Sequence, residues 1–243
     1  MDAQYILMFV VVLVAYFVRG LTGFGSGLIA IPILAMFAPL TFVVPVIMTL
    51  DFISSFILGG VDRSKTDWTE VGSLLPFGLL GALLGTYVLV NFPTTPVLVA
   101  LALFTVFFGA RNALGIQPKG AISRLWSIPA GIVGSGAGAL FGTSAPPYIM
   151  YLTHRLPDKT AARATFSWLF IIDGGFRLIL FAIAGLLLTV DALTAIAIGL
   201  IPMGIGLFGG NHAHVRISRD VLLRFVGGFL VFSGGTLLTR VMV

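Results

Sequence analysis

The chain has 243 residues, of which 58% are hydrophobic and only 9% are charged, and its mean hydropathy is +1.09. A water-soluble domain carries roughly 25% charged residues, so this composition excludes a surface that faces water all round. It predicts an integral membrane protein. The formal net charge of +5 does not indicate nucleic-acid binding, because the charges lie between apolar segments and form no basic face. The lack of cysteine excludes disulfides, iron–sulfur clusters and thiol chemistry.

The apolar segments occur in the same order twice. A membrane-spanning helix needs about 20 apolar residues. In chain order, we expect a broken segment at roughly 4–38 and helices near 41–60, 70–90 and 94–114, then a broken segment near 124–152 and helices near 160–187, 190–210 and 220–242. The prediction is an all-α polytopic membrane protein of about ten helical segments. It forms a single membrane domain over 1–243, with repeat one at about 1–115 and repeat two at about 122–243.

A glycine-rich run that carries serine interrupts each broken segment. The first run is Gly20-Leu-Thr-Gly-Phe-Gly-Ser-Gly27, followed by Pro32. The second is Gly131-Ile-Val-Gly-Ser-Gly-Ala-Gly138, followed by Gly142-Thr-Ser-Ala-Pro-Pro147. In lipid, backbone that leaves helical geometry is tolerated only around a cavity or inside protein, and paired breaks in two halves are typical of a transporter's binding site. The alternative is close helix packing, as we expect for Gly81, Gly85 and Gly227-Gly228.

Basic residues cluster in some joints between segments and are absent from others. They are Arg63, Lys65, Arg111, Lys119, Arg124, Arg155, Lys159, Arg163, Arg216, Arg219 and Arg224, whereas the joints at 91–93 and 188–191 carry none. If each broken segment makes an even number of passes, as two short helices or as a re-entrant dip, every basic joint falls on one face. The positive-inside rule makes that face cytoplasmic and places both termini outside the cytoplasm. The halves then form an inverted-topology repeat.

We expect the two runs to hold a small anion, because broken helices direct free N–H groups and positive dipole ends toward the middle of the membrane. The candidate substrate-binding residues are Thr22, Gly23, Gly25, Ser26, Gly27, Thr49, Gly134, Ser135, Gly136, Thr143, Ser144, Thr165, Ser167 and Arg177. Thr49 stands 17 residues after Pro32 and Thr165 stands 18 after Pro147, which predicts corresponding depths. Alternatively, these hydroxyls only bond to their own helix carbonyls.

Four charged residues fall inside or at the edge of apolar segments: Arg19, Asp51, Asp173 and Arg177. A charge in the middle of a bilayer costs about 2.5–3.5 kcal/mol on insertion scales and usually serves a pathway or a partner. Asp173 and Arg177, four residues apart, can form a structural ion pair or act on substrate. If Asp51 is neutral, it is a protonation site that can couple transport to protons. If it is charged, it needs the positive charge of Arg19 or Arg177 nearby. Asp51 and Asp173 are therefore candidates for proton coupling.

The sequence indicates no metal site and no other cofactor. His212 and His214 lie two residues apart, with no carboxylate or cysteine close in sequence, and make weak metal ligands. The expected partners are a small anionic substrate and the lipid bilayer. Nothing in the sequence indicates an oligomeric state.

Glycine-rich breaks followed by proline, a Thr- or Ser-bearing next helix, and repetition of both in the second half resemble the TauE/SafE family of sulfite exporters. The resemblance covers the chain from about Tyr16 to the last helix. It implies a prokaryotic plasma-membrane transporter of sulfur oxyanions or organosulfonates, such as sulfite and sulfoacetate. The chain differs in Gly25-Ser-Gly27, where family members often have consecutive glycines, and in the extension Thr143-Ser-Ala-Pro-Pro147. We expect alternating access around a midplane site, without enzyme activity.

Two other classes of protein remain as alternatives. An anion-selective channel could use the same breaks as a filter. An intramembrane serine hydrolase could use Ser26 or Ser135 as its nucleophile, but such a serine needs a base within hydrogen-bond reach. The three histidines, His154, His212 and His214, all lie in predicted cytoplasmic loops.

Overall fold

The computed structural model describes residues 3–22, 25–58, 63–114, 120, 122–213 and 219–242. Within these ranges the chain forms ten α-helices, two short 3-10 helices and no strand. The elements are α1 (Ala3–Thr22), α2 (Ser26–Leu34), α3 (Leu40–Leu58), η1 (Arg63–Lys65), α4 (Trp68–Asn91), α5 (Thr94–Ala113), η2 (Arg124–Trp126), α6 (Ser127–Phe141), α7 (Ala145–Arg155), α8 (Lys159–Ile183), α9 (Val190–Ala213) and α10 (Arg219–Met242). The predicted all-α fold of about ten segments is confirmed.

Both broken segments consist of two helices that meet at a glycine in left-handed geometry. Gly25, between α1 and α2, has φ +99°, and Gly142, between α6 and α7, has φ +63°. This region favours glycine because other residues clash there through their Cβ atoms. The first break therefore lies inside the glycine run that predicts it.

The second break does not lie where the glycine run predicts it. The run from Gly131 to Gly138 is helical throughout and belongs to α6, and the chain leaves helical geometry only at Gly142. The physical reason is that glycine permits a break without requiring one. Helical glycines here serve close packing, while the left-handed Gly142 and the following Pro146 and Pro147 end one helix and begin the next.

The helix that follows each break is too short to cross a bilayer. At 1.5 Å per residue, the nine residues of α2 and the eleven of α7 span about 14 and 17 Å, against a hydrocarbon core of about 30 Å. Among the described residues, five helical stretches are long and apolar enough to cross: Leu40–Ile57, Trp68–Asn91, Thr94–Arg111, Thr160–Ile183 and Val190–His212. The chain is thus a multi-pass membrane protein with two short helices at its breaks.

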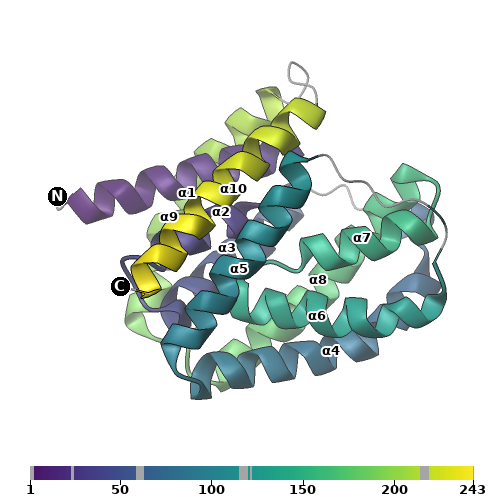
Figure 1. Ribbon diagram of the computed structural model, residues 1–243, viewed down its shortest axis with the longest axis horizontal. Coiled ribbons are helices and arrows are strands. Elements are labelled where there is room, and N and C mark those ends of the chain that lie inside the picture. Colours follow the sequence, from purple (N-terminus) through teal and green to yellow (C-terminus); the bar gives the residue numbers. More distant parts are fainter. Residues whose placement is uncertain are drawn as a thin grey trace.

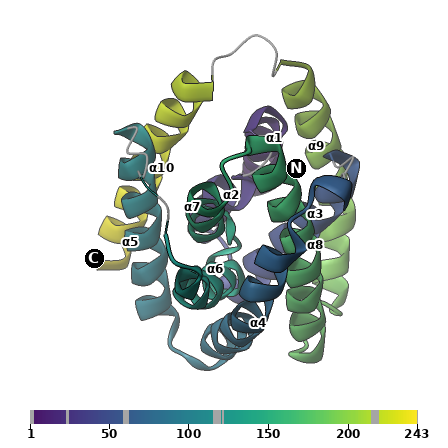
Figure 2. The same ribbon diagram turned by 90° about the vertical axis from the view of Figure 1, so that its right-hand side faces the viewer.

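Helices from different halves of the chain pack in pairs. Helix α4 lies along α6, α1 lies along α9, and α5 lies along α10 (Figure 1). Viewed from the side of Figure 2, α2 and α7 lie near the centre and the longer helices surround them. The buried apolar core of this bundle takes residues from both halves. The breaks are therefore enclosed by protein, as polar backbone at membrane depth requires.

Glycines form the close contacts within these helix pairs. A Cβ on Gly85 of α4 would lie 2.7 Å from the carbonyl oxygen of Gly136 in α6, and one on Gly81 would overlap the backbone of Ile132. A Cβ on Gly227 of α10 would lie 2.5 Å from the nitrogen of Ala113 in α5. The packing interpretation is confirmed for Gly81, Gly85 and Gly227, and Gly136 lies in the same kind of contact. It is wrong for Gly228, which is exposed and has nothing within 4 Å of a Cβ placed on it, because it lies on the side of α10 away from α5.

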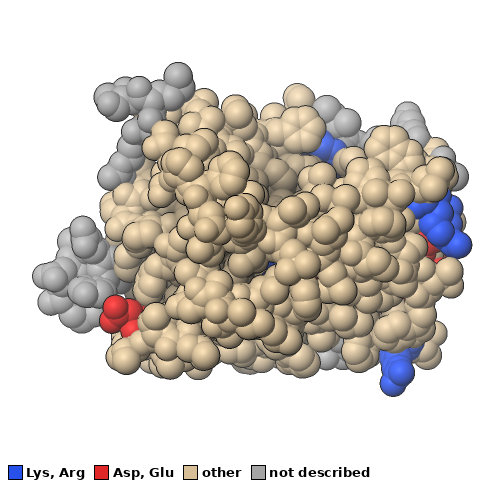
Figure 3. Space-filling model, turned by 90° about the horizontal axis from the view of Figure 1, so that it is seen from below, with Lys and Arg blue, Asp and Glu red and all other residues tan. Residues whose placement is uncertain are grey.

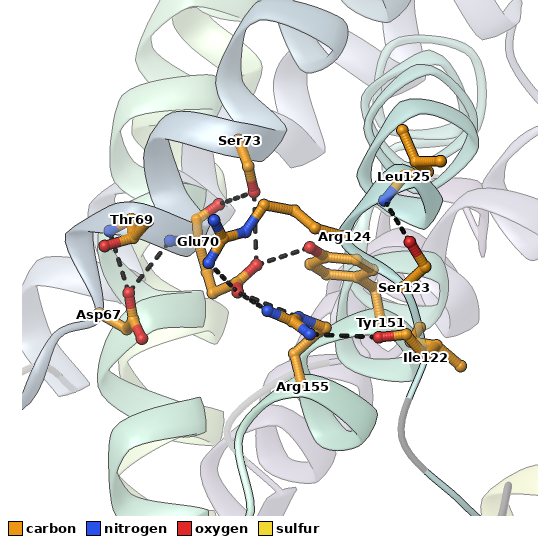
Figure 4. Close-up of polar contacts among 10 residues, drawn as sticks. All are labelled: Asp67, Thr69, Glu70, Ser73, Ile122, Ser123, Arg124, Leu125, Tyr151 and Arg155. Atoms are coloured by element: carbon orange, nitrogen blue, oxygen red, sulfur yellow. Dashed lines mark hydrogen bonds and ion pairs between the residues drawn. The ribbon is translucent and has the colours of Figure 1, made fainter.

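The second broken segment enters and leaves the bundle at one end. Arg124 precedes α6 and Arg155 ends α7, yet both reach Glu70 in the first turn of α4, as Figure 4 shows. Their Nη2 atoms lie 3.3 and 2.8 Å from Glu70 Oε1, and Tyr151 OH donates to Oε2 at 2.6 Å. Helices α6 and α7 therefore form a hairpin that closes around the start of α4.

Helix α2 leads to the opposite end of the bundle. The joint after it shares a small pocket with the last turn of α4 and the start of α5, lined by Pro39, Leu40, Thr41, Leu89, Phe92, Thr94 and Val97. Glu70 and Leu89 mark the two ends of α4. The two short helices therefore run from the breaks to opposite ends of the molecule. An inverted relation of the complete halves stays a prediction.

On the face seen in Figure 3, charged side chains avoid the middle. In Figure 3, Lys and Arg gather toward the end formed by the start of α4 and the joint between α7 and α8, and the broad middle of this face is uncharged. An uncharged middle with basic residues at one end is what a lipid-embedded protein presents.

Candidate functional site

Two buried polar clusters lie beside the breaks, one from each half. The first cluster comprises Tyr16, Arg19, Ser26, Asp51 and Ser55, and the second cluster comprises Ser135, Ser144, Tyr148, Asp173 and Arg177. In each cluster an aspartate pairs with an arginine and both contact serine: the same serine in the first cluster, and two different serines in the second. The exposed fractions of the ionised residues range from 0 to 4%, so all four charges lie inside the protein.

In the first cluster, Asp51 receives three polar contacts on one oxygen. Its Oδ1 atom accepts hydrogen bonds from Ser26 Oγ at 2.5 Å and Tyr16 OH at 2.6 Å, and it lies 3.2 Å from Arg19 Nη1. Arg19 Nη1 also donates to Ser26 Oγ at 3.0 Å. Its Nη2 donates to the Asp51 carbonyl at 3.1 Å and to Ser55 Oγ at 2.8 Å. The partner of Asp51 is therefore Arg19, on α1.

In the second cluster, the ion pair lies within one helix. Arg177 Nη2 is 3.2 Å from Asp173 Oδ2, one turn earlier on α8, as their four-residue spacing predicts. Asp173 Oδ1 accepts a hydrogen bond from Ser135 Oγ of α6 at 2.5 Å. Arg177 Nη2 also donates to Ser144 Oγ, the N-cap residue of α7, at 3.4 Å. Residues on both sides of the second break thus contact one ion pair.

The two breaks touch each other between the clusters. A Cβ on Gly27 would overlap the carbonyl oxygen of Gly142, and it would lie 3.7 Å from Asp51 Oδ2. The guanidinium groups of Arg19 and Arg177 both lie over the ring of Phe170, at 5.4 and 5.9 Å from its centroid. Such cation–π contacts favour desolvated cations. Both clusters and both breaks therefore meet near the centre of the bundle.

Several predicted hydroxyls lie apart from these clusters. Thr49 Oγ1 donates to the carbonyl of Pro45 at 2.8 Å, which is the bond within its own helix that we gave as the alternative. Thr165 Oγ1 accepts from the N–H of Asp67 at 2.9 Å, at the start of α4, two turns of α8 away from Asp173. Ser167 is half-buried on α8. Their substrate role stays a prediction.

The remaining candidates divide between the breaks and the helix contacts. Thr143 is buried within the second break, and Gly25 is the N-cap residue of α2. Gly134 lies against the ring of Tyr148. Gly23, the side chain of Thr22, the side chain of Arg163 and His214 lie outside the described residues.

The backbone at the start of α7 offers fewer donors than the sequence interpretation expects. Pro146 and Pro147 lie in its first turn and have no N–H, so two of the groups that would point toward an anion are missing. The first residues of α2, Ser26 to Ile29, all carry an N–H. Around the second break, side-chain donors must therefore replace backbone donors.

Sequence reasoning missed two tyrosines that belong to the clusters. Tyr16 and Tyr148 are fully buried, and both approach an aspartate. Tyrosine in membrane proteins usually lies at the membrane–water interface. A tyrosine inside an apolar segment and close to a break is the signal that could have identified both.

The positions of His154 and His212 do not support a serine hydrolase site. His154 is exposed on α7 and contacts the carbonyl of Met150, and His212 contacts that of Phe208, so neither histidine lies beside Ser26 or Ser135. In the described ranges, no group of three His, Cys, Asp or Glu side chains could hold a metal ion.

A multi-pass helical protein whose broken helices meet beside buried, paired charges has the architecture of a membrane transporter. Comparison with known proteins defines the family. The chain belongs to the TauE/SafE family, because the family model described as "Sulfite exporter TauE/SafE" matches residues 8–237. The chain is therefore a membrane transporter of this family, and the predicted family is confirmed.

The chain is also similar to a protein of Comamonas testosteroni described as "Probable inner membrane transporter protein TsaS". The two are 24% identical over 193 residues, which cover 77% of this chain and 79% of that protein. No solved structure matches the chain.

Proposed function

We propose that this protein is a plasma-membrane secondary transporter that exports small anions such as sulfite or organosulfonates. Membership of a sulfite exporter family and similarity to a probable inner membrane transporter support this assignment. The observation that carries it is the contact of Gly27 with Gly142 between two buried Ser–Asp–Arg clusters. The two guanidinium groups supply positive potential where little water competes.

The proposed mechanism is alternating access around this contact. Helices α2 and α7 run from it to opposite ends of the bundle, so displacement of one or the other would open the centre to one side of the membrane. Gly25 and Gly142 are the left-handed positions at which each short helix can turn. The serines Ser26, Ser135 and Ser144 would exchange their present partners for the anion.

Asp51 and Asp173 are the proposed sites of proton coupling. Each carboxylate neutralises a buried arginine, and protonation would leave that arginine free to bind an anion instead. We further propose that the basic end of the bundle is cytoplasmic, that both termini lie outside the cytoplasm, and that the halves are inverted repeats.

Thermal unfolding of the purified protein with sulfite, sulfoacetate, sulfate or acetate tests the anion assignment. A ligand that binds only the folded state stabilises it by RT ln(1 + [L]/Kd), or about 2.7 kcal/mol at 100 times Kd. We expect selective stabilisation by sulfite or sulfoacetate relative to chloride at equal ionic strength. No shift, or equal shifts with all five anions, would contradict the assignment.

A further inference from the structure

The two clusters differ in how their hydrogen-bond donors are used. In the first cluster, Tyr16 OH donates to Asp51 Oδ1 and contacts the carbonyl of Ile47 at 3.2 Å, and both terminal nitrogens of Arg19 donate. In the second cluster, three donors have no hydrogen-bond partner, Tyr148 OH, Arg177 Nη1 and Arg177 Nε, and Asp173 Oδ2 has only its ion pair with Arg177 Nη2. Tyr148 and Arg177 are both 0% exposed. The first cluster leaves one donor, Arg19 Nε, without a partner, whereas the second leaves three.

Such donors are uncommon inside proteins. Nearly all buried polar groups are hydrogen-bonded, and a buried donor without an acceptor is costly, more so when it is charged. Burial between α6, α7 and α8 separates Arg177 from solvent, and its Nη2 is already engaged by Asp173 and Ser144. An acceptor that reaches Nη1, Nε or the phenol would relieve this cost.

Glycines of α6 position both donor side chains. Gly138 lies against Arg177 Nη1, where any Cβ would overlap the guanidinium, and Gly134, one turn earlier, lies against the ring of Tyr148. Tyr148 OH lies beside Ser135 and Asp173, but it makes no hydrogen bond of normal distance and angle to either. The phenol and the guanidinium therefore flank the same carboxylate and face the same side of α6.

We infer that Tyr148 and Arg177 form a single oxyanion site in the second cluster, and that the first cluster is a structural ion pair that joins α1 to α3. This inference rests on the proposed anion transport, adds the donors and the number of sites, and narrows the proposal in one respect: Ser26 and Asp51 hold the first cluster together and bind neither the anion nor a transported proton. The ligand is an anion with at least two acceptor oxygens, such as sulfite, a sulfonate or a carboxylate, because the donors belong to two side chains. The chain binds one anion.

Two matched phenol deletions test the inference. In Y148F we expect the Kd for sulfite to rise about tenfold or more, since hydrogen bonds to charged groups are the stronger ones, while the unfolding temperature without ligand is unchanged or higher. In Y16F, which loses the bond to Asp51, we expect a lower unfolding temperature without ligand and a Kd within about twofold of wild type. Titration calorimetry of the purified full chain with sulfite gives Kd and stoichiometry, and thermal unfolding gives stability.

The outcomes separate this inference from the proposed function. Sulfite binding by Y148F equal to that of wild type, loss of stability in Y148F as large as in Y16F, or two sulfite ions per chain would each overturn the single site while leaving anion transport in place. If wild type binds no sulfite, sulfoacetate or carboxylate, both the proposed function and the site are wrong.

Discussion

The R177M variant should unfold far more easily than wild type, and adding D173N to it should restore most of the lost stability. Removal of Arg177 leaves Asp173 buried at 0% exposure with no counter-charge, which typically costs about 3–5 kcal/mol. In the double variant neither charge remains, and the side-chain amide introduced by D173N can still accept the hydrogen bond from Ser135. The free energy of unfolding in detergent, measured for both variants, checks this result.

R124M is the matched control for this pair. Arg124 also contacts a carboxylate, Glu70, at 3.3 Å, but its side chain is 54% exposed, so its loss should cost about 1 kcal/mol or less. Neither R177M nor the double variant should bind sulfite, since both lack the buried guanidinium. A double variant as unstable as R177M would show that the pair is not a coupled unit, and sulfite binding by the double variant would exclude Arg177 from the site.

The G27A variant should lose transport and stability because the two breaks can no longer touch. The new Cβ would overlap the Gly142 carbonyl, which is backbone and cannot rotate away. Overpacking of this kind costs about 1–3 kcal/mol, and here it also separates the two clusters. The measurements are thermal unfolding and sulfite uptake into vesicles.

G204A controls for the loss of glycine itself. Gly204 lies within α9, and nothing is found within 4 Å of a Cβ placed on it. Alanine is favoured over glycine in a helix by about 1 kcal/mol, so G204A should equal or exceed wild-type stability and transport normally. If G27A behaves as G204A does, contact between the breaks is not required for function.

Features that depend on local sequence could be predicted. The alternation of apolar segments with basic or Pro-containing joints predicts the ten helices, since spanning length and turn residues are local properties. The pair of Asp173 and Arg177 follows from helical spacing alone. The first break could be predicted because the glycine run at 20–27 contains Gly25, the residue that adopts left-handed geometry.

Features that depend on packing could not be predicted in the same way. Arg19 on α1 pairs with Asp51 on α3, across the first break. Their separation of 32 residues in the sequence does not indicate that Arg19, and not Arg177, is the partner of Asp51. Thr49 and Thr165 stand at corresponding positions in the two halves of the sequence, but their surroundings differ. Thr49 bonds to a carbonyl of its own helix, whereas Thr165 accepts a hydrogen bond from an N–H at the start of α4. The second glycine run forms a helix because α4 packs against it, which only the fold reveals.

Sulfite flux into proteoliposomes tests the central claim most directly. For wild type we expect saturable uptake that follows a sulfite gradient, and for the D173N/R177M variant, reconstituted to the same level, we expect none. Equal uptake by both proteins, or a sulfite current that rises without saturation, would contradict a carrier that binds its anion between the two breaks.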